Sequence, residues 1–98
     1  MNIGLTPSEI TMIIKVITQS GVTKAVVFGS RAKGTWANNS DIDIAVFGSN
    51  INIGHLSLCL DELPIPYKFD IVDYEKTTHI PLREHIDRVG VVIYEKNE

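Results

Sequence analysis

Hydrophobic and polar positions alternate along this chain with two periods, one typical of helices and one typical of strands. The helical period begins at Thr6, which can cap a helix, followed by Pro7, which suits the first helical position. Glu9 stands where it completes a capping box. Isoleucines then recur at helical spacing and predict one apolar face, namely Ile10, Ile13, Ile14 and Ile17. Gly21 ends the predicted helix, because glycine tolerates the left-handed turn that follows many helices.

Short apolar runs rich in strand-forming residues alternate with helical segments over the rest of the chain. The predicted strands cover residues 25–28, 41–47, 68–72 and 91–94. The predicted helices cover residues 30–37, 55–63 and 81–88. The connection between the first two strands is short for a parallel crossover, so we expect a mixed sheet. The pattern therefore predicts an α/β (α+β) fold, a mixed β-sheet flanked by helices.

Composition and charge narrow this picture mainly by exclusion. Hydrophobic residues make up 44% and charged residues 21% of the 98 residues, which predicts one folded domain over residues 1–98 rather than disorder. The formal net charge of −3 does not favour a nucleic-acid partner. Cys59 is the only cysteine, which excludes an intrachain disulfide and fits a reducing compartment. Because we see neither a signal peptide nor an apolar run of roughly 20 residues, we expect a soluble cytoplasmic protein with no membrane partner.

Asp41 and Asp43 are the first candidates for chemistry. Successive side chains of a strand face opposite sides, so these two carboxylates share one face while Ile42 and Ile44 share the other. Two carboxylates on one face repel each other unless a cation lies between them, and Mg²⁺ prefers carboxylate and phosphate oxygens. In the plainer interpretation, Asp41 caps the preceding turn and Asp43 lies exposed at a strand edge.

A second group of candidates lies just upstream, where the first strand gives way to a helix. Gly29 would let the backbone approach a phosphate closely, and the Ser30 hydroxyl could donate a hydrogen bond to it. Arg31 and Lys33 would add positive charge, with arginine better suited to bidentate phosphate contact. The alternative is an ordinary turn glycine followed by a solvated helix face.

Asp70 is a third carboxylate, placed between apolar neighbours in a short predicted strand. Burying it without a cation or a hydrogen-bond donor would be costly, so either it shares a metal site with Asp43 or it simply faces solvent. In that site it would also help to deprotonate an acceptor hydroxyl. Asp73 is its rival, but its parity and its place near the strand end make it the weaker candidate.

These residues resemble the signature of a known family. Residues 29–34 read Gly-Ser-Arg-Ala-Lys-Gly, and residues 40–46 read Ser-Asp-Ile-Asp-Ile-Ala-Val. The order is similar to that of the DNA polymerase beta-type nucleotidyltransferase superfamily, and more closely to that of the minimal nucleotidyltransferases. The similarity extends to Asp70 and to the closing helix and strand at residues 85–94, so it covers nearly the whole chain.

The resemblance implies the nucleotidyltransferase fold in a single nucleotidyltransferase domain, residues 1–98. It implies Mg²⁺-dependent transfer of a nucleoside monophosphate, most simply AMP from ATP, onto an acceptor hydroxyl with release of pyrophosphate. In such a site two Mg²⁺ ions are expected, and the metal-binding and catalytic residues would be Asp41, Asp43 and Asp70. The nucleotide-binding residues would be Gly29, Ser30, Arg31 and Lys33.

The resemblance also implies a class of partner. Minimal members often pair with a small helical HEPN protein, some of them as the antitoxin of a toxin–antitoxin pair that adenylylates a tyrosine of the toxin. A partner protein is therefore the expected acceptor, and whether the chain also forms a homodimer stays open. The alternative is a non-catalytic antitoxin or scaffold that binds a helical partner. A glycosyltransferase, which also uses Asp-x-Asp, is a weaker third option because sugar transfer usually needs a larger domain.

Other polar and aromatic residues are interpreted as structural. A zinc site would need more ligands in tighter groups, so four residues are assigned to the surface or the packing: His55, Cys59, His79 and His85. Tyr67 and Tyr74 are expected to pack beside the third strand. Trp36 could stack on a base or pack the loop against the domain, and the sequence does not decide between the two.

Overall fold

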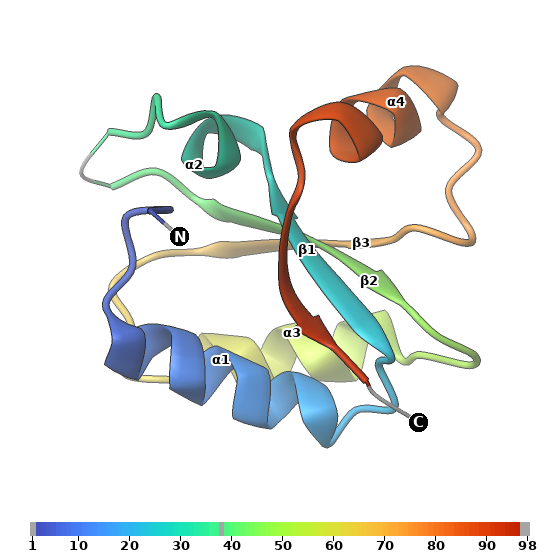
Figure 1. Cartoon of the computed structure of the whole chain (residues 1–98). Helices are drawn as coiled ribbons and strands as arrows, with labels where there is room; N and C mark the ends of the chain where they lie inside the picture. The colour runs from blue at the N-terminus through green and yellow to red at the C-terminus, as the bar shows by residue number, and fades with distance from the viewer. Residues whose placement is uncertain (1, 38, 97–98) are drawn as a thin grey trace.

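Helices and strands alternate through the chain, with a helix first and a strand last (Figure 1). The computed structural model describes residues 2–37 and 39–96. The helices in these residues are α1 (Pro7–Thr18), α2 (Gly29–Lys33), α3 (Ile53–Asp61) and α4 (Ile80–Val89). The strands are β1 (Lys24–Phe28), β2 (Ile42–Phe47), β3 (Phe69–Asp73) and β4 (Val91–Glu95). The predicted order of the elements is confirmed.

The strands form one mixed sheet in the order β3-β2-β1-β4. β1 pairs antiparallel with β2 and with β4, whereas β2 and β3 are parallel. The described residues between β1 and β2, 29–37 and 39–41, carry the short α2 as their one helix, and the chain returns beside β1 in the opposite direction. Residues 48–68 carry α3 across the sheet, which is the longer connection that a parallel pair needs. The expected mixed sheet flanked by helices is therefore confirmed.

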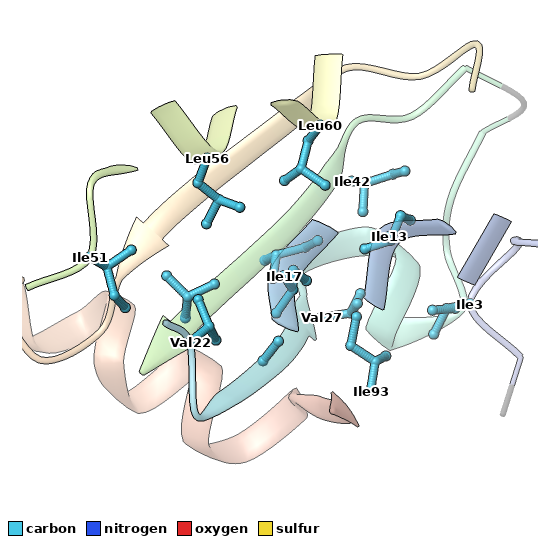
Figure 2. Packing of buried hydrophobic residues seen from close by; sticks show 13 residues of the cluster. Ile3, Ile13, Ile17, Val22, Val27, Ile42, Ile51, Leu56, Leu60 and Ile93 are labelled. Carbon is cyan, nitrogen blue, oxygen red and sulfur yellow. The ribbon is translucent and has the colours of Figure 1, made fainter. Parts of the chain in front are cut away.

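The two faces of the sheet are covered unequally. α1 and α3 lie side by side on one face, and α4 lies on the other face near α2 (Figure 1). Figure 2 shows the larger core between α1, α3 and the sheet, where Ile13, Ile17, Leu56 and Leu60 are fully buried. A smaller cluster joins α4 to the opposite face and consists of Val26, Phe28, Ala45 and Ile86.

Local signals explain where the first helix begins and ends. The Thr6 hydroxyl accepts a hydrogen bond from the Glu9 backbone N–H, and the Glu9 carboxylate accepts one from the Thr6 backbone N–H. Both halves of the predicted capping box are therefore formed. Gly21 follows the helix with a φ of 76°, the left-handed conformation expected of it.

The second and third helices differ from their predicted ranges. α2 ends at Lys33 rather than at residue 37, because Gly34 adopts a left-handed conformation with a φ of 78°. α3 begins at Ile53, two residues early, because the Asn52 side chain caps it by accepting from the His55 backbone N–H. Across residues 2–37 and 39–96, no helix combines the length and apolarity that would be needed to cross a membrane.

Candidate active site

Two of the three candidate carboxylates are brought together by strand alternation and register. Ile42 and Ile44 are buried in the core beneath α1 and α3, so Asp43 between them faces the α4 side of the sheet. In the parallel pairing of β2 with β3, Asp43 stands opposite Asp70. Asp41 precedes β2 and has the same parity as Asp43. All three carboxylates therefore belong to the face that α1 and α3 leave uncovered.

This arrangement destabilises the charged form of Asp43. Its side chain is half-buried, whereas Asp41 and Asp70 are exposed. Burial raises the pKa of Asp43 above its ordinary value of 3.8, and the negative charges of Asp70 and Asp41 raise it further. The positive charge of Arg31 acts in the opposite direction and lowers this pKa. The site thus concentrates negative charge that a cation would stabilise.

Gly29 forms the corner between β1 and α2, directly against Asp43. Its φ is 74°, a conformation that residues with side chains adopt only at a cost. A Cβ at this position would collide with Asp43 Oδ2. Phe28 also pairs with Asp43 in the antiparallel register of β1 and β2. The Gly29–Ser30 corner and the carboxylate face therefore form one continuous site.

His85 is a neighbour of this corner that sequence reasoning assigned to structure or surface. Its Nε2 accepts a hydrogen bond from the Gly29 backbone N–H at 3.3 Å, and its ring contacts Phe28 edge-on, with ring centroids 6.1 Å apart. The signal that could have placed it is helical spacing: His85 lies three residues after Leu82 and directly before Ile86, and both of these residues help to pack α4 on the sheet.

Arg31 is found in a different place from the one predicted for a phosphate contact. Its side chain is only 1% exposed, and it donates hydrogen bonds to four backbone carbonyl oxygens. A guanidinium with these partners is not presented to a phosphate, so that prediction is corrected. Lys33, at the end of the short α2, is exposed, and Ser30 is half-buried at the corner.

The remaining candidates have structural partners. His79 caps α4 by accepting from the Leu82 backbone N–H at 3.2 Å. The Cys59 thiol and His55 Nε2 lie 3.5 Å apart on α3, away from the carboxylate face. Asp73 has the opposite parity to Asp70, and its Oδ1 accepts from the Glu75 backbone N–H. Its Oδ2 is buried and finds no hydrogen-bond partner among the described residues.

Two tyrosines and the single tryptophan pack as the sequence allowed. The Tyr67 ring lies 4.3 Å from the Arg31 guanidinium carbon, measured to the ring centroid. Tyr74 stacks on Phe47 with centroids 4.4 Å apart and donates a hydrogen bond to Asp87 Oδ1 at 2.6 Å. Trp36 packs on the backbone of Gly4, where an added Cβ would lie 2.7 Å from the indole.

The donor set suits a hard divalent cation in its chemistry. It offers carboxylate oxygens, which Mg²⁺ prefers, and their mutual repulsion is relieved by a cation. Within residues 2–37 and 39–96, however, no three acidic, histidine or cysteine side chains are already arranged as a metal site. The same residues enclose no pocket. The carboxylates therefore form an open face rather than a closed metal cage.

Comparison with known proteins places these features in a family. The sequence profile described as Polymerase beta, Nucleotidyltransferase matches residues 11–98. A relative from Haemophilus influenzae, named "Probable protein adenylyltransferase MntA", is 35% identical over 97 residues. That match covers 93% of this chain and 84% of the relative.

Solved structures share the fold. One is a chain of a toxin–antitoxin complex with AMP-PNP, which is 26% identical with a TM-score of 0.75, covering 90% of this chain and 74% of its own. Another comes from a complex of a tri-AMPylated Shewanella oneidensis HEPN toxin with its MNT antitoxin. It is 22% identical with a TM-score of 0.69, covers 91% of this chain and 71% of its own, and shows the fold alone. Because the family profile spans most of the sequence and the Haemophilus relative matches along most of its length, this chain belongs to the polymerase beta nucleotidyltransferase family.

Proposed function

We propose that this chain is a Mg²⁺-dependent adenylyltransferase that moves AMP from ATP onto a hydroxyl of a partner protein. The observation that carries the proposal is the pairing of Asp43 with Asp70 on one sheet face, directly against the Gly29 corner. This is the arrangement that the transfer requires, because the phosphates must lie between a backbone that can approach them closely and the acids that serve the reacting oxygens.

In this proposal, phosphate binding and proton removal are assigned to different residues of the chain. Gly29 and Ser30 bind the β- and γ-phosphates, with the Ser30 hydroxyl donating to a phosphate oxygen. Lys33, exposed at the end of α2, adds positive charge beside them. Asp70 takes the proton of the acceptor hydroxyl as its oxygen attacks the α-phosphorus. The bond from that phosphorus to the oxygen bridging to the β-phosphate breaks, and pyrophosphate leaves with the bond's electron pair.

Asp41, Asp43 and Asp70 are the residues that would hold Mg²⁺, and we propose two ions. When bound, the metal offsets charge on the phosphoryl oxygens and on the leaving pyrophosphate. The carboxylates fit this role because Asp43 is destabilised in its charged form by burial and by its two acidic neighbours. Ionised Asp43 therefore gains more from a nearby cation than an isolated surface carboxylate would.

The acceptor in this proposal is a small helical protein of the HEPN type, with this chain as its antitoxin in the cytoplasm. The Haemophilus relative is named as a protein adenylyltransferase, and a similar chain comes from a toxin–antitoxin complex with AMP-PNP, an analogue of ATP. The absence of an enclosed pocket in the described residues fits an acceptor that completes the site from outside. Residues 1–98 are proposed to act as one nucleotidyltransferase domain.

The direct test uses ATP labelled at either end of its triphosphate. The protein is incubated with Mg²⁺, the product of the neighbouring gene, and ATP labelled at the α- or the γ-phosphate. Transfer of AMP predicts a labelled partner only from the α-label, whereas label from the γ-phosphate would indicate a kinase and contradict the proposal. Parallel reactions with α-labelled GTP, CTP and UTP measure nucleotide preference.

Matched variants assign the activity to the site. Asp41→Asn and Asp43→Asn are expected to abolish transfer, and chelation of Mg²⁺ should do the same. Asp61→Asn is the control, because it removes an equal charge from the end of α3, on the opposite face of the sheet. Full transfer by Asp43→Asn would exclude the mechanism.

The second candidate function is a non-catalytic antitoxin or scaffold. It is favoured by the openness of the acidic face, which is not arranged as a metal site on its own. Calorimetry separates the two functions: Mg²⁺-dependent ATP binding that is lost in Asp43→Asn supports the enzyme, whereas partner binding that is independent of metal and nucleotide, with no ATP binding, supports the scaffold.

A further inference from the structure

The Arg31 guanidinium is a buried charge whose hydrogen bonds all go to backbone carbonyl oxygens. It is 1% exposed, and it lies on the short α2 directly after the Gly29–Ser30 corner. Burying a guanidinium is costly unless its N–H groups are satisfied, and each carbonyl partner reduces that cost. The positions of the four carbonyls therefore show which parts of the chain Arg31 holds together.

Two of these carbonyls belong to the segment that leads into the acidic strand. Arg31 Nη2 donates to the Ser40 carbonyl at 2.8 Å, and Nε donates to the Asp41 carbonyl at 3.3 Å. These bonds hold the backbone at residues 40 and 41. Asp41 is itself one of the candidate acids, and it precedes Asp43 by two residues. Arg31, which directly follows the proposed phosphate-binding corner at Gly29–Ser30, thus holds the backbone at the start of β2, the strand that carries Asp43.

The other two carbonyls belong to the segment before α1. Arg31 Nη1 donates to the Ile3 and Gly4 carbonyls, each at 3.1 Å. At Gly4, an added Cβ would lie 2.7 Å from Trp36 and 2.8 Å from Arg31 Nη1, so the segment passes tightly over both side chains. This contact closes the guanidinium off from solvent.

An aromatic ring extends the contact to the third carboxylate. The Tyr67 ring centroid lies 4.3 Å from the Arg31 guanidinium carbon, a distance typical of cation–π stacking. Tyr67 precedes Asp70 by three residues, and the Lys68 carbonyl between them accepts from the Ile42 backbone N–H. Arg31 therefore contacts the chain just before β2 and just before β3, the two strands beside which the acids lie.

We propose that Arg31 is a positioning residue, which sets the place of the acid-bearing strands relative to the phosphate corner without contacting the nucleotide. The inference rests on the function proposed above, because the distance that it sets matters only if phosphate and acids act together. Arginine suits this role because its planar fork presents N–H groups in several directions and reaches four separate carbonyls here, whereas lysine donates from one point.

The test compares Arg31→Lys, which keeps the charge, with a core variant that destabilises the fold elsewhere. Ile17→Val serves as that control, because Ile17 is fully buried in α1, which covers the face of the sheet opposite the acids, and it makes no hydrogen bond with Arg31. Three readouts are measured under conditions in which circular dichroism shows all proteins to be folded. They are the kcat and KM for ATP, the amide hydrogen exchange of residues 39–43, and the fluorescence of Trp36, the single tryptophan.

Positioning predicts a split among these readouts. In Arg31→Lys, kcat should fall by about 100-fold, the scale of a misplaced reacting group. The KM for ATP should change by no more than about threefold, because the phosphate corner is retained. Exchange at residues 39–43 should quicken by about tenfold, and Trp36 emission should shift to the red as its packing loosens. Ile17→Val should show none of these changes.

Each contrary outcome is decisive. A folded Arg31→Lys protein with unchanged kcat, or with unchanged exchange at residues 39–43, would overturn the proposal, as would equal losses in Ile17→Val. If Arg31→Lys does not fold, Tyr67→Leu removes the stacking face and should give the same pattern more weakly; unchanged exchange there would also overturn it. If the wild-type protein transfers no AMP, the proposed function fails, while the exchange and fluorescence measurements still decide whether Arg31 holds this segment.

Discussion

The Asp43 carboxylate occupies the space that a side chain at residue 29 would need, so the site depends on a glycine at this position. The backbone of Gly29 has a φ of 74°, and Asp43 Oδ2 occupies the position that a Cβ on Gly29 would need. Glycine is therefore required at this corner for two reasons: its left-handed backbone conformation and the carboxylate that lies beside it. The proximity of the Gly29–Ser30 corner to the acids depends on the absence of a side chain at residue 29.

A pair of glycine variants separates these two requirements. Gly34 has nearly the same φ, 78°, but nothing lies within 4 Å of an added Cβ. Gly34→Ala should lower the free energy of unfolding by about 1–2 kcal/mol, the cost of a left-handed alanine. Gly29→Ala should cost more than this and also abolish transfer, because Asp43 must move. Urea unfolding measures both, and an equal loss of stability in the two variants would show that the contact with Asp43 is unimportant.

The raised pKa of Asp43 predicts a pH-dependent effect on stability. Since its folded-state pKa lies above the ordinary value of 3.8, its contribution to stability is complete below pH 3.8 and is lost as the pH rises through the folded-state pKa. At pH 7, Asp43→Asn should therefore unfold at a higher temperature than the wild type, although it is expected to be inactive.

Thermal unfolding between pH 3 and pH 7 checks this sign. The advantage of Asp43→Asn should shrink as the pH falls, because the wild-type carboxyl becomes neutral too. Glu84→Gln, a charge removal at an exposed position of α4, is the control and should show little change. A variant less stable than the wild type at pH 7 would mean that ionised Asp43 is stabilised by contacts outweighing its burial and acidic neighbours.

At the scale of elements, the sequence predicts what local interactions determine. Thr6, Pro7 and Glu9 lie next to each other in the chain, and the capping box that they predicted is present. The existence and order of the other elements also followed from local periodicity. The end of α2 did not, because Gly34 both tolerates a helix and stops one, and only the adopted φ of 78° distinguishes these roles.

The site was predictable to the same extent. The shared parity of Asp41 and Asp43 is a property of one strand, so it could be inferred before any topology was known. The opposition of Asp43 and Asp70 needed the order and register of the sheet. The partners of Arg31 are contributed by segments 9 to 28 residues away in the chain, and the Gly29–His85 bond spans 56 residues. No local pattern distinguishes a buried arginine with such partners from an exposed one.

At the scale of the whole molecule, the larger hydrophobic core and the candidate catalytic acids lie on opposite faces of the sheet. The larger core lies beneath α1 and α3, whereas the acids share the other face with the smaller cluster under α4. A domain of this size buries a limited area, and crowding three carboxylates on one face reduces its stability further. Ligands that neutralise that face should therefore stabilise the entire fold, because small domains unfold cooperatively.

This linkage predicts a large thermal shift with Mg²⁺ and ATP together. Binding to the folded state alone adds about 2.7 kcal/mol at a ligand concentration 100-fold above Kd. For a domain of 60–100 residues, each kcal/mol raises the unfolding midpoint by roughly 4–8 °C, so a rise of at least about 10 °C is expected. An ATP analogue with a methylene group in place of the oxygen between its α- and β-phosphates should serve in calorimetry, because the bond broken in AMP transfer is then replaced and turnover cannot deplete the ligand.

Removal of the metal or of one acid tests where this stabilisation originates. Chelation of Mg²⁺ should remove most of the shift, and Asp43→Asn should lose it even with Mg²⁺ present, whereas Asp61→Asn should retain it. A shift that survived both chelation and Asp43→Asn would locate the nucleotide away from the acidic face. Loss of the shift in Asp43→Asn alone, in a protein that is otherwise more stable at pH 7, would mean that the charge which weakens the free fold is the charge that binds the ligand. The cost in stability and the capacity for transfer would then have one origin, the carboxylates crowded beside Gly29.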